Sequence, residues 1–370
     1  MLTTGTVIDG WHAMENSDHK NPGSRLVDVL TPVWEGVLRR SPILPDDNFF
    51  DLGGDQALAE QLICAMSAAL GSETPLTLIY DAPTIASVVK AWADGNIARS
   101  SALVLLREGR EAPPIFLFHG LGGTLIEFAP LAKRSWANHP IYGIQSRGLT
   151  PGDAPDDRIE AMAAHCLEAI KEIQQHGPFY LVGNSTGGLV ALEAAQSLLR
   201  QGEKVALLAL LDTYPYPRFW PREAWLSVLR RRIKHHWSVV RQMSRRELLP
   251  YMMGRWETLQ DHFRSRLGGR LRKPVSDGVL VPMALRRLRE GFILAFSNYR
   301  PKPYRGKIIF FKPKVATQFP DDPKMVWRSL AEEVEVHMTP GDHVGMSTVH
   351  ADVLAAELLR CIETLPSGHQ

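Results

Sequence analysis

The sequence predicts an α/β fold, in which a mostly parallel sheet covered on both faces follows a small all-helical block. Short, near-continuous apolar runs alternate with helical patterns over residues 102–366, as expected of strands buried on both faces. One turn between a strand and a helix has the pattern Gly-x-Ser-x-Gly around Ser185. With 370 residues, 45% of them hydrophobic, the chain can bury a core of this size.

The helical block is expected at residues 25–95. Apolar residues recur at helical spacing over 26–38, and a second helix is expected over 56–70. Short helical segments follow over 76–80 and 84–92. No part of this block carries catalytic groups at working spacing, so the chemistry is expected elsewhere.

The sequence on either side of the helical block predicts a leader before it and a linker after it. Residues 1–24 are polar without the basic-then-apolar start of a signal peptide, and are expected to form a flexible leader. Residues 96–101 are expected to be a linker. No apolar run reaches the ~18 residues of a membrane span, so no transmembrane segment is expected. Three widely spaced cysteines show neither metal spacing nor C-x-x-C, which predicts no metal site and a reducing, cytoplasmic location.

The remaining chain, residues 102–366, is expected to form the sheet domain. Apolar runs predict strands over residues 102–106, 115–118, 141–144, 179–182, 205–211, 308–311 and 334–338. Helical patterns between them are clearest over 159–176 and 186–201. This alternation indicates a mostly parallel sheet with helices on both faces.

The alternation is interrupted at about residues 214–300, where no strand is expected. Helical patterns over 222–242, 245–266 and 281–299 predict three helices. We interpret this segment as a lid over the carboxyl ends of the strands, where open α/β sheets bind ligands. The alternative is a helical subdomain without a role in the site.

Ser185 is the candidate nucleophile. A Gly-x-Ser-x-Gly turn between strand and helix forces the serine into a strained backbone that only small neighbours permit, and it lifts the hydroxyl above the sheet. Gly183 and Gly187 supply those neighbours. A glycine-rich loop with an incidental serine is the alternative, and the strand before the turn and the helix after it disfavour that alternative.

A serine hydroxyl needs a base within hydrogen-bonding reach and an acid that orients the base. Asp212 follows the strand 205–211, the place expected for the acid in the chain order Ser, Asp, His. His343 lies in the loop after the last strand and is the expected base. Its nearest competitors are His119, in the first loop of the sheet domain, and His337, inside a strand.

An oxyanion intermediate needs backbone N–H donors, usually one after the nucleophile and one in an early strand-to-helix loop. Thr186 supplies the first. Leu121, in the glycine-rich loop after strand 115–118, is the expected second donor, with Gly122 close behind. Such a loop could also bind phosphate, but no Lys-Ser/Thr follows it.

Four motifs in this domain resemble one enzyme family: PIFLFHGLGG, GNSTGG, LLDTYP and TPGDHVGM. Across about residues 100–365 the chain resembles the type I thioesterase domains of nonribosomal peptide and polyketide synthases, which have the α/β-hydrolase fold. The resemblance implies Ser185 as nucleophile, Asp212 as orienting acid and His343 as general base. It also implies Leu121 and Thr186 as oxyanion donors.

The helical block resembles the carrier domain of the same synthases, through the sequences DNFFDLGGD and YDAPTI. The resemblance implies a serine directly after the first sequence as the attachment point of phosphopantetheine. Gln56 stands there instead, and an amide has no hydroxyl for this attachment. We therefore expect a pseudo-carrier without a covalent cofactor, with phosphopantetheine on the substrate or on a partner carrier. An engineered substitution is the alternative origin of Gln56, although alanine would be the usual choice.

The implied activity is release of an acyl or peptidyl chain from a phosphopantetheine thioester by hydrolysis, through an acyl-serine intermediate. Transfer of the acyl group to an alcohol or amine, including ring closure, is the second hypothesis. A non-catalytic docking protein is the third, and the candidate triad disfavours it.

The near-neutral net charge hides an asymmetry. Residues 25–95 hold 4 Lys/Arg against 10 Asp/Glu, whereas residues 218–290 hold 18 against 6. Complementary charge predicts that the basic segment receives an acidic surface, either the pseudo-carrier itself or a separate acylated carrier in trans, or the phosphates of a thioester cofactor. The alternative is an ordinary solvated face, and nucleic-acid binding is not expected.

Overall fold

The helical block forms as the sequence predicts. The computed structural model describes residues 22–72, 74–75, 77–95, 102–110, 112–134, 136–149, 154–242 and 283–365. The helices of the block are α2 (Pro22–Leu38), α3 (Gln56–Leu70), α4 (Leu78–Asp81) and α5 (Ile85–Ala93). Because α2 begins at Pro22, it takes in the last three residues of the expected leader. The rest of the leader and the expected linker 96–101 lie outside the described residues.

A seven-stranded sheet follows in the order β1-β3-β2-β4-β5-β6-β7. Only β1 is antiparallel to its neighbour, and the other pairings are parallel. The strands are β1 (Leu103–Arg107), β2 (Ile115–Phe118), β3 (Ile141–Ile144), β4 (Phe179–Asn184), β5 (Val205–Leu211), β6 (Tyr304–Pro313) and β7 (Ala331–Thr339). All seven predicted strands are present, and β6 and β7 extend beyond the apolar runs that predict them, because pairing between the two continues into polar residues.

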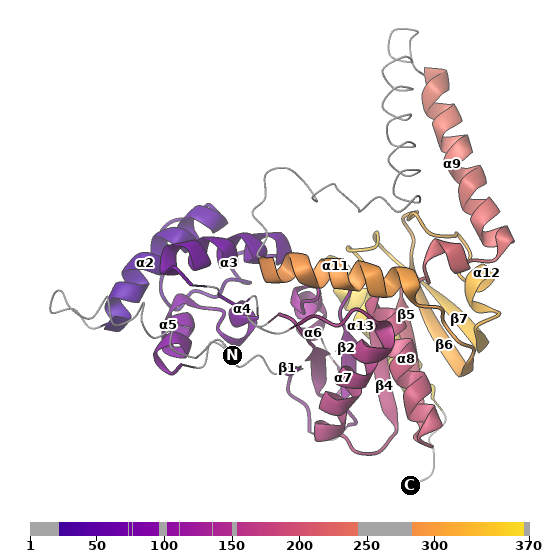
Figure 1. Cartoon of the computed structure of the whole chain (residues 1–370), viewed down its shortest axis with the longest axis horizontal. Helices are drawn as coiled ribbons and strands as arrows, with labels where there is room; N and C mark the ends of the chain where they lie inside the picture. The colour runs from indigo at the N-terminus through magenta and orange to yellow at the C-terminus, as the bar shows by residue number, and fades with distance from the viewer. Residues whose placement is uncertain are drawn as a thin grey trace.

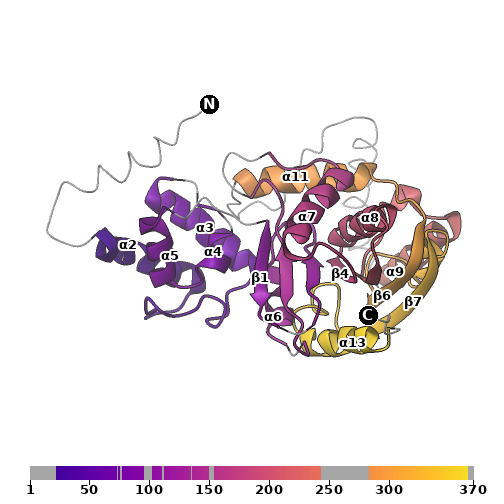
Figure 2. The ribbon, with the colours of Figure 1, turned by 90° about the horizontal axis from the view of Figure 1, so that it is seen from below.

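Helices cover both faces of the sheet (Figures 1 and 2). One face carries α7 (Ile159–Ile173), α8 (Gly187–Arg200) and α11 (Met283–Asn298), and the other carries α6 (Ala129–Ala132) and α13 (Ala351–Glu363). The short elements are the 3-10 turns η2 (Ile126–Phe128) and η3 (Pro217–Phe219), and helix α12 (Lys324–Trp327). The buried apolar residues form two clusters, one on each face, and the first continues into the helical block.

The insertion between β5 and β6 contains α9 (Arg222–Gln242) and α11, two of the three predicted helices. The third expected helix, 245–266, lies outside the described residues. Figure 1 shows α11 lying lengthwise over the sheet domain with its first residues next to α3. Among the described residues, no helix is both long and apolar enough to cross a membrane.

Candidate active site

Ser185 lies at the turn between β4 and α8 with a backbone φ of 53°. Side chains other than glycine rarely adopt this left-handed conformation, and its cost must be balanced by surrounding contacts. The Ser185 N–H donates to the carbonyl of Leu211 at 2.9 Å, which fastens the turn to the end of β5. A methyl group on Gly187 would lie 2.0 Å from the His119 carbonyl oxygen, so glycine is required for this close approach.

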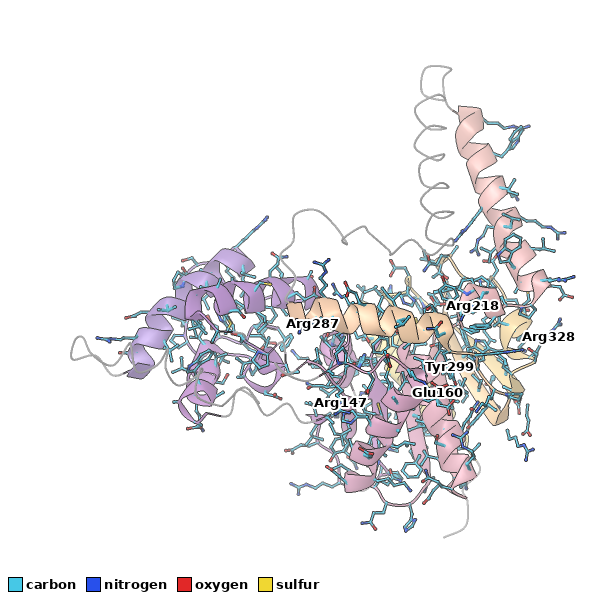
Figure 3. All side chains as sticks on the ribbon, viewed as in Figure 1. Arg147, Glu160, Arg218, Arg287, Tyr299 and Arg328 are labelled. Carbon is cyan, nitrogen blue, oxygen red and sulfur yellow. The ribbon has the colours of Figure 1, made fainter. Side chains whose placement is uncertain are left out.

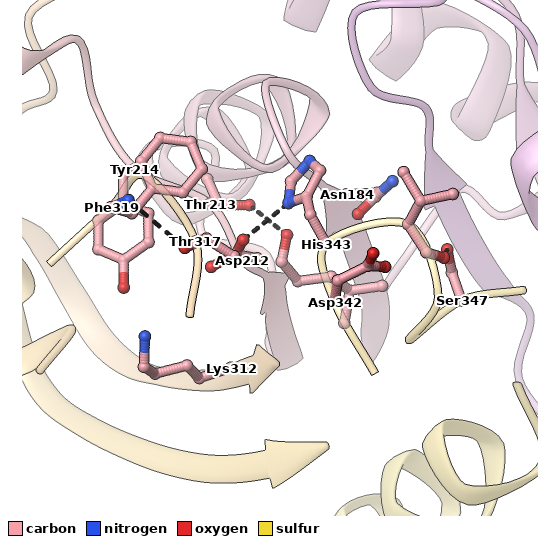
Figure 4. Close-up of polar contacts among 12 residues, drawn as sticks. Asn184, Asp212, Thr213, Tyr214, Lys312, Thr317, Phe319, Asp342, His343 and Ser347 are labelled. Atoms are coloured by element: carbon pink, nitrogen blue, oxygen red, sulfur yellow. Dashed lines mark hydrogen bonds and ion pairs between the residues drawn. The ribbon is translucent and has the colours of Figure 1, made fainter. Parts of the chain in front are cut away.

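Asp212 and His343 meet beside this turn. The Asp212 backbone also has positive φ, 42°, and its N–H donates to the Phe311 carbonyl at 2.8 Å. The Asp212 carboxylate is completely buried, and its Oδ2 lies 2.7 Å from Nδ1 of His343 (Figure 4). This bond leaves Nε2 of His343 for a second partner. No hydrogen bond joins Ser185 to His343 in the described part of the chain.

The pKa of His343 reflects two opposing effects. Burial by itself would lower it, but the hydrogen bond and the negative charge of Asp212 outweigh burial and raise the pKa above the usual 6.5. A histidine held in this way accepts a proton more readily than a free one. This is the electrostatic arrangement that a general base requires.

The two competing histidines are engaged elsewhere. His119 is buried between the Gly120 carbonyl and the Ser146 hydroxyl, both 2.7 Å from its ring nitrogens, and burial lowers its pKa to about 4. His337, on β7, lies 2.8 Å from the Glu335 carboxylate. Neither competitor has the buried aspartate partner of His343.

Ser185 lines a cavity of about 450 Å³ below the helical insertion. The expected oxyanion donors Leu121 and Thr186 both line it, as does Asp212. Most of the remaining wall is apolar and largely aromatic, and includes Tyr214, Trp220, Trp225, Val228, Ile293 and Phe296. The cavity lies over the carboxyl ends of β4 and β5, where open α/β sheets bind ligands.

Residues 113–364, about two thirds of the chain, match the model of the thioesterase domain family. The chain belongs to this family. Residues 28–92 match the model of the phosphopantetheine attachment site, so a carrier domain precedes the thioesterase domain. Both resemblances inferred from the sequence motifs are confirmed.

The chain is also similar to parts of large synthetases. Over 340 residues, 86% of this chain, it is 28% identical to the dimodular nonribosomal peptide synthase of Bacillus subtilis (strain 168). It is 37% identical over 191 residues, 51% of this chain, to the indigoidine synthase of Dickeya dadantii (strain 3937). The chain spans 13% of the length of each of these two relatives.

Among solved structures, a four-domain nonribosomal peptide synthetase with AMP and glycine bound superposes with a TM-score of 0.55. The two are 23% identical, and the match covers 95% of this chain and 27% of the other. This similarity concerns the fold. The predicted fold class, an α/β-hydrolase domain preceded by a helical carrier domain, is confirmed.

The carrier domain does not fit its expected prosthetic group. Gln56 is the first residue of α3, and Asp55 caps the helix by accepting a bond from the Leu58 N–H at 2.9 Å. The Gln56 amide donates to the Glu60 carboxylate at 3.0 Å. With no hydroxyl on residue 56, phosphopantetheine has no oxygen to attach to at this position.

Glu127 is a site residue that the sequence analysis missed. Its carboxylate accepts hydrogen bonds from the Gly120 N–H at 2.5 Å and from the Asn184 side chain at 2.9 Å. It therefore ties the glycine-rich loop to the residue before Ser185. Burial raises its pKa to about 7, although both hydrogen bonds lower it. Glu127 belongs to no recognisable sequence motif. Only its position a few residues after the glycine-rich loop could have suggested a role at the site.

Basic residues in the described part of the insertion lie in different places and have different partners. Arg231 binds Asp321 and the carbonyls of Thr317 and Phe319, so it holds α9 to the domain beneath it. Figure 3 shows Arg287 at the end of α11 near the carrier domain, far from Arg218 and Arg328. The described residues include no group of three His, Cys, Asp or Glu side chains able to bind a metal ion.

We predict that Glu127→Ala lowers the kcat of a small acyl ester by about 10- to 100-fold, because the loop that carries Leu121 loses its anchor. Glu127→Gln should stay within about threefold of the wild type. Its amide oxygen can accept from Gly120, and once the Asn184 amide turns over, its NH₂ can donate to Asn184 Oδ1, a buried oxygen without a partner in the described structure. Equal kcat values for the Ala and Gln variants would contradict this positioning role.

Comparison of the wild type with Glu127→Gln tests the charge. Because the folded pKa of Glu127, about 7, lies above its unfolded value, the folded protein gains a proton as pH falls through 7. The free energy of unfolding of the wild type, relative to Glu127→Gln, should therefore rise as pH falls from about 8 to 5. Denaturant unfolding of both proteins across this window measures the difference.

Proposed function

We propose that this chain is a serine thioesterase that releases an acyl or peptidyl chain from a phosphopantetheine thioester by hydrolysis. The observation that carries the proposal is the 2.7 Å bond between the buried Asp212 and His343, next to the turn that presents Ser185. Family membership supports the reaction class. A docking protein without activity would not need a buried carboxylate that holds a histidine in one tautomer.

In the first half of the reaction, Nε2 of His343 takes the hydroxyl proton as Ser185 Oγ attacks the thioester carbonyl. The Asp212 carboxylate stabilises the imidazolium that forms. The carbonyl C–S bond then breaks, the thiol leaves with the proton returned by His343, and the acyl group stays on Ser185. In the second half, His343 removes a proton from water, which attacks the acyl ester and releases a carboxylic acid and free Ser185.

The backbone N–H groups of Leu121 and Thr186 are proposed to bind the oxyanion of both tetrahedral intermediates. Their place on the cavity wall with Ser185 supports this role. Thr186 is also the N-cap residue of α8, whose positive N-terminal end favours negative charge nearby. Such preorganised donors commonly supply about 10²- to 10³-fold of the rate.

The acyl chain is proposed to lie in the cavity below α9 and α11. Its aromatic wall favours an acyl group with substantial apolar surface, because burial of that surface contributes to binding. The thioester itself is proposed to be attached elsewhere than at residue 56, since Gln56 has no hydroxyl to hold it. Acyl transfer uses the same intermediate, and analysis of products in the presence of alcohols and amines separates it from hydrolysis.

We predict that Ser185→Ala and His343→Ala each lower turnover of an acyl thioester by about 10³-fold or more, and that Asp212→Asn has a somewhat milder effect. His176→Ala is the matched control, because this histidine is exposed and pairs with Glu203 on the surface. Steady-state kinetics on purified variants measure the loss. Near-normal turnover of His343→Ala would place the base elsewhere.

A second prediction concerns the carrier domain. Incubation with coenzyme A and a promiscuous phosphopantetheinyl transferase should leave the mass of the intact protein unchanged, because Gln56 has no hydroxyl. Gln56→Ser restores that hydroxyl and is the matched variant. A gain of about 340 Da by the wild type, the mass of the attached arm, mapped to a residue in 25–95 would show that the carrier domain can be loaded.

A further inference from the structure

The glycine-rich loop is held through the carbonyl of Gly120 as well as through its N–H. The carbonyl oxygen lies 2.7 Å from Nδ1 of His119 and accepts a second hydrogen bond from the Gly123 N–H at 3.1 Å. The Gly120 N–H donates to Glu127. A methyl group on Gly120 would lie 3.3 Å from Cβ of Ser185. Both backbone polar groups of Gly120 are therefore held in fixed directions beside the proposed nucleophile.

The direction of the Gly120 carbonyl sets the direction of the next N–H group. The Gly120 C=O and the Leu121 N–H belong to one planar trans peptide unit, in which the two bonds point in opposite directions. Hydrogen bonds that hold the carbonyl on one side of the loop therefore turn the Leu121 N–H to the other side. Leu121 and Ser185 line the same cavity, and within the described residues the Leu121 N–H makes no hydrogen bond. It is available to a group bound in the cavity.

The partners of His119 fix its tautomer. A carbonyl oxygen can only accept, so Nδ1 of His119 carries the hydrogen. Nε2 lies 2.7 Å from the Ser146 hydroxyl, and in a neutral ring it can only accept from that hydroxyl. Burial lowers the pKa of His119 to about 4 and outweighs the opposing effect of the Gly120 hydrogen bond, so the ring is neutral near pH 7. Ser146 therefore supports the tautomer that binds the Gly120 carbonyl.

Helix α11 buries this ring. Phe292 packs edge-on against His119, with 5.5 Å between the ring centroids, and His119 is only 7% exposed. A methyl group on Gly123 would lie 2.2 Å from a methyl carbon of Leu288, so the same helix also packs on the loop. A hydrogen bond shielded from water in this way is stronger than an exposed one. The bond from His119 to Gly120 is thus well suited to hold the loop in one conformation.

We propose that His119 is a positioning residue for the oxyanion site. Its neutral ring, oriented by Ser146, holds the Gly120 carbonyl so that the Leu121 N–H faces the substrate oxygen on which negative charge develops. His119 exchanges no proton with the substrate and does not replace His343 as the base. The inference rests on the proposed acyl-serine reaction and assigns a role to a buried histidine that the triad does not use.

Two replacements of similar shape separate positioning from burial. In His119→Asn the amide NH₂ branches from the γ carbon, as Nδ1 does, and can still donate to Gly120, whereas His119→Leu has no donor. With a small acyl ester, His119→Leu should lower kcat by about 10- to 100-fold and change KM by less than about threefold. His119→Asn should recover most of this loss and stay within about fivefold of the wild type.

His139 provides the matched control. It is also buried, and its Nδ1 lies 2.7 Å from the Pro113 carbonyl. Both residues precede parallel strands, so this bond lies at the amino ends of β2 and β3, opposite to the glycine-rich loop. His139→Leu should lower the free energy of unfolding, as His119→Leu does, but leave kcat unchanged. A fall in kcat that follows the loss of stability in both leucine variants would show that His119 has only a structural role.

Two measurements without thioester turnover separate this inference from the proposed function. NMR of protein with isotope-labelled histidine nitrogens should show His119 with hydrogen on Nδ1 and none on Nε2 near pH 7, the signal being assigned by its absence from His119→Asn. An alkyl fluorophosphonate should label Ser185, with release of fluoride, about tenfold or more slowly in His119→Leu than in His119→Asn.

The outcomes of these measurements are distinct. Labelling of the wild type at Ser185 without hydrolysis of any thioester would contradict the proposed function alone. Equal labelling rates of the two His119 variants, or a hydrogen on Nε2 instead of Nδ1, would overturn the positioning role of His119.

Discussion

The close approach of three loops around the Ser185 turn is the constraint on which the site depends. The turn is fastened to β5 through the Leu211 carbonyl and to the loop after β2 through the contact of Gly187 with His119. A methyl group on Gly188 would lie 2.1 Å from the Thr213 hydroxyl. These contacts bring the proposed nucleophile, the proposed acid and the glycine-rich loop together without relying on the side chains of Ser185, Asp212 or His343.

Two carboxylates, Asp212 and Glu127, have different roles within this arrangement of loops. Asp212 is fully buried and holds His343, whose pKa it raises. Glu127 holds the Gly120 N–H and Asn184, and its own pKa is raised by burial. One carboxylate thus orients the proposed base, and the other fixes the loop proposed to bind the oxyanion. Their different partners give two groups of one chemical type separate roles.

The fold can be predicted from the sequence because the two patterns that indicate it are local. Apolar runs mark each strand, and the Gly-x-Ser-x-Gly turn needs only its own neighbours. Asp212 and His343 are predicted for a similar reason, since Asp212 directly follows a strand and His343 lies in the loop after the last strand. Glu127 could not be found in this way, because its role depends on contacts with Gly120 and Asn184, the second of which is 57 residues away.

The sequence predicts opposite charge at the contact between the two domains but not the residues that form it. Opposite charge suggested that the insertion meets the acidic block, and Arg289 does bind Glu60. The sequence could not single out this pair among 18 basic residues. Another of them, Arg231, holds α9 in place instead. Charge composition predicts which regions of the chain attract one another. The two residues that form a single buried ion pair can be identified only from the fold.

The proposed acyl-serine intermediate is tested most directly by intact-protein mass spectrometry after exposure to a panel of acyl thioesters. We predict a persistent gain in mass equal to one acyl group, mapped to Ser185, and its absence from Ser185→Ala. An adduct on another residue, or an equal adduct on Ser185→Ala, would contradict the account.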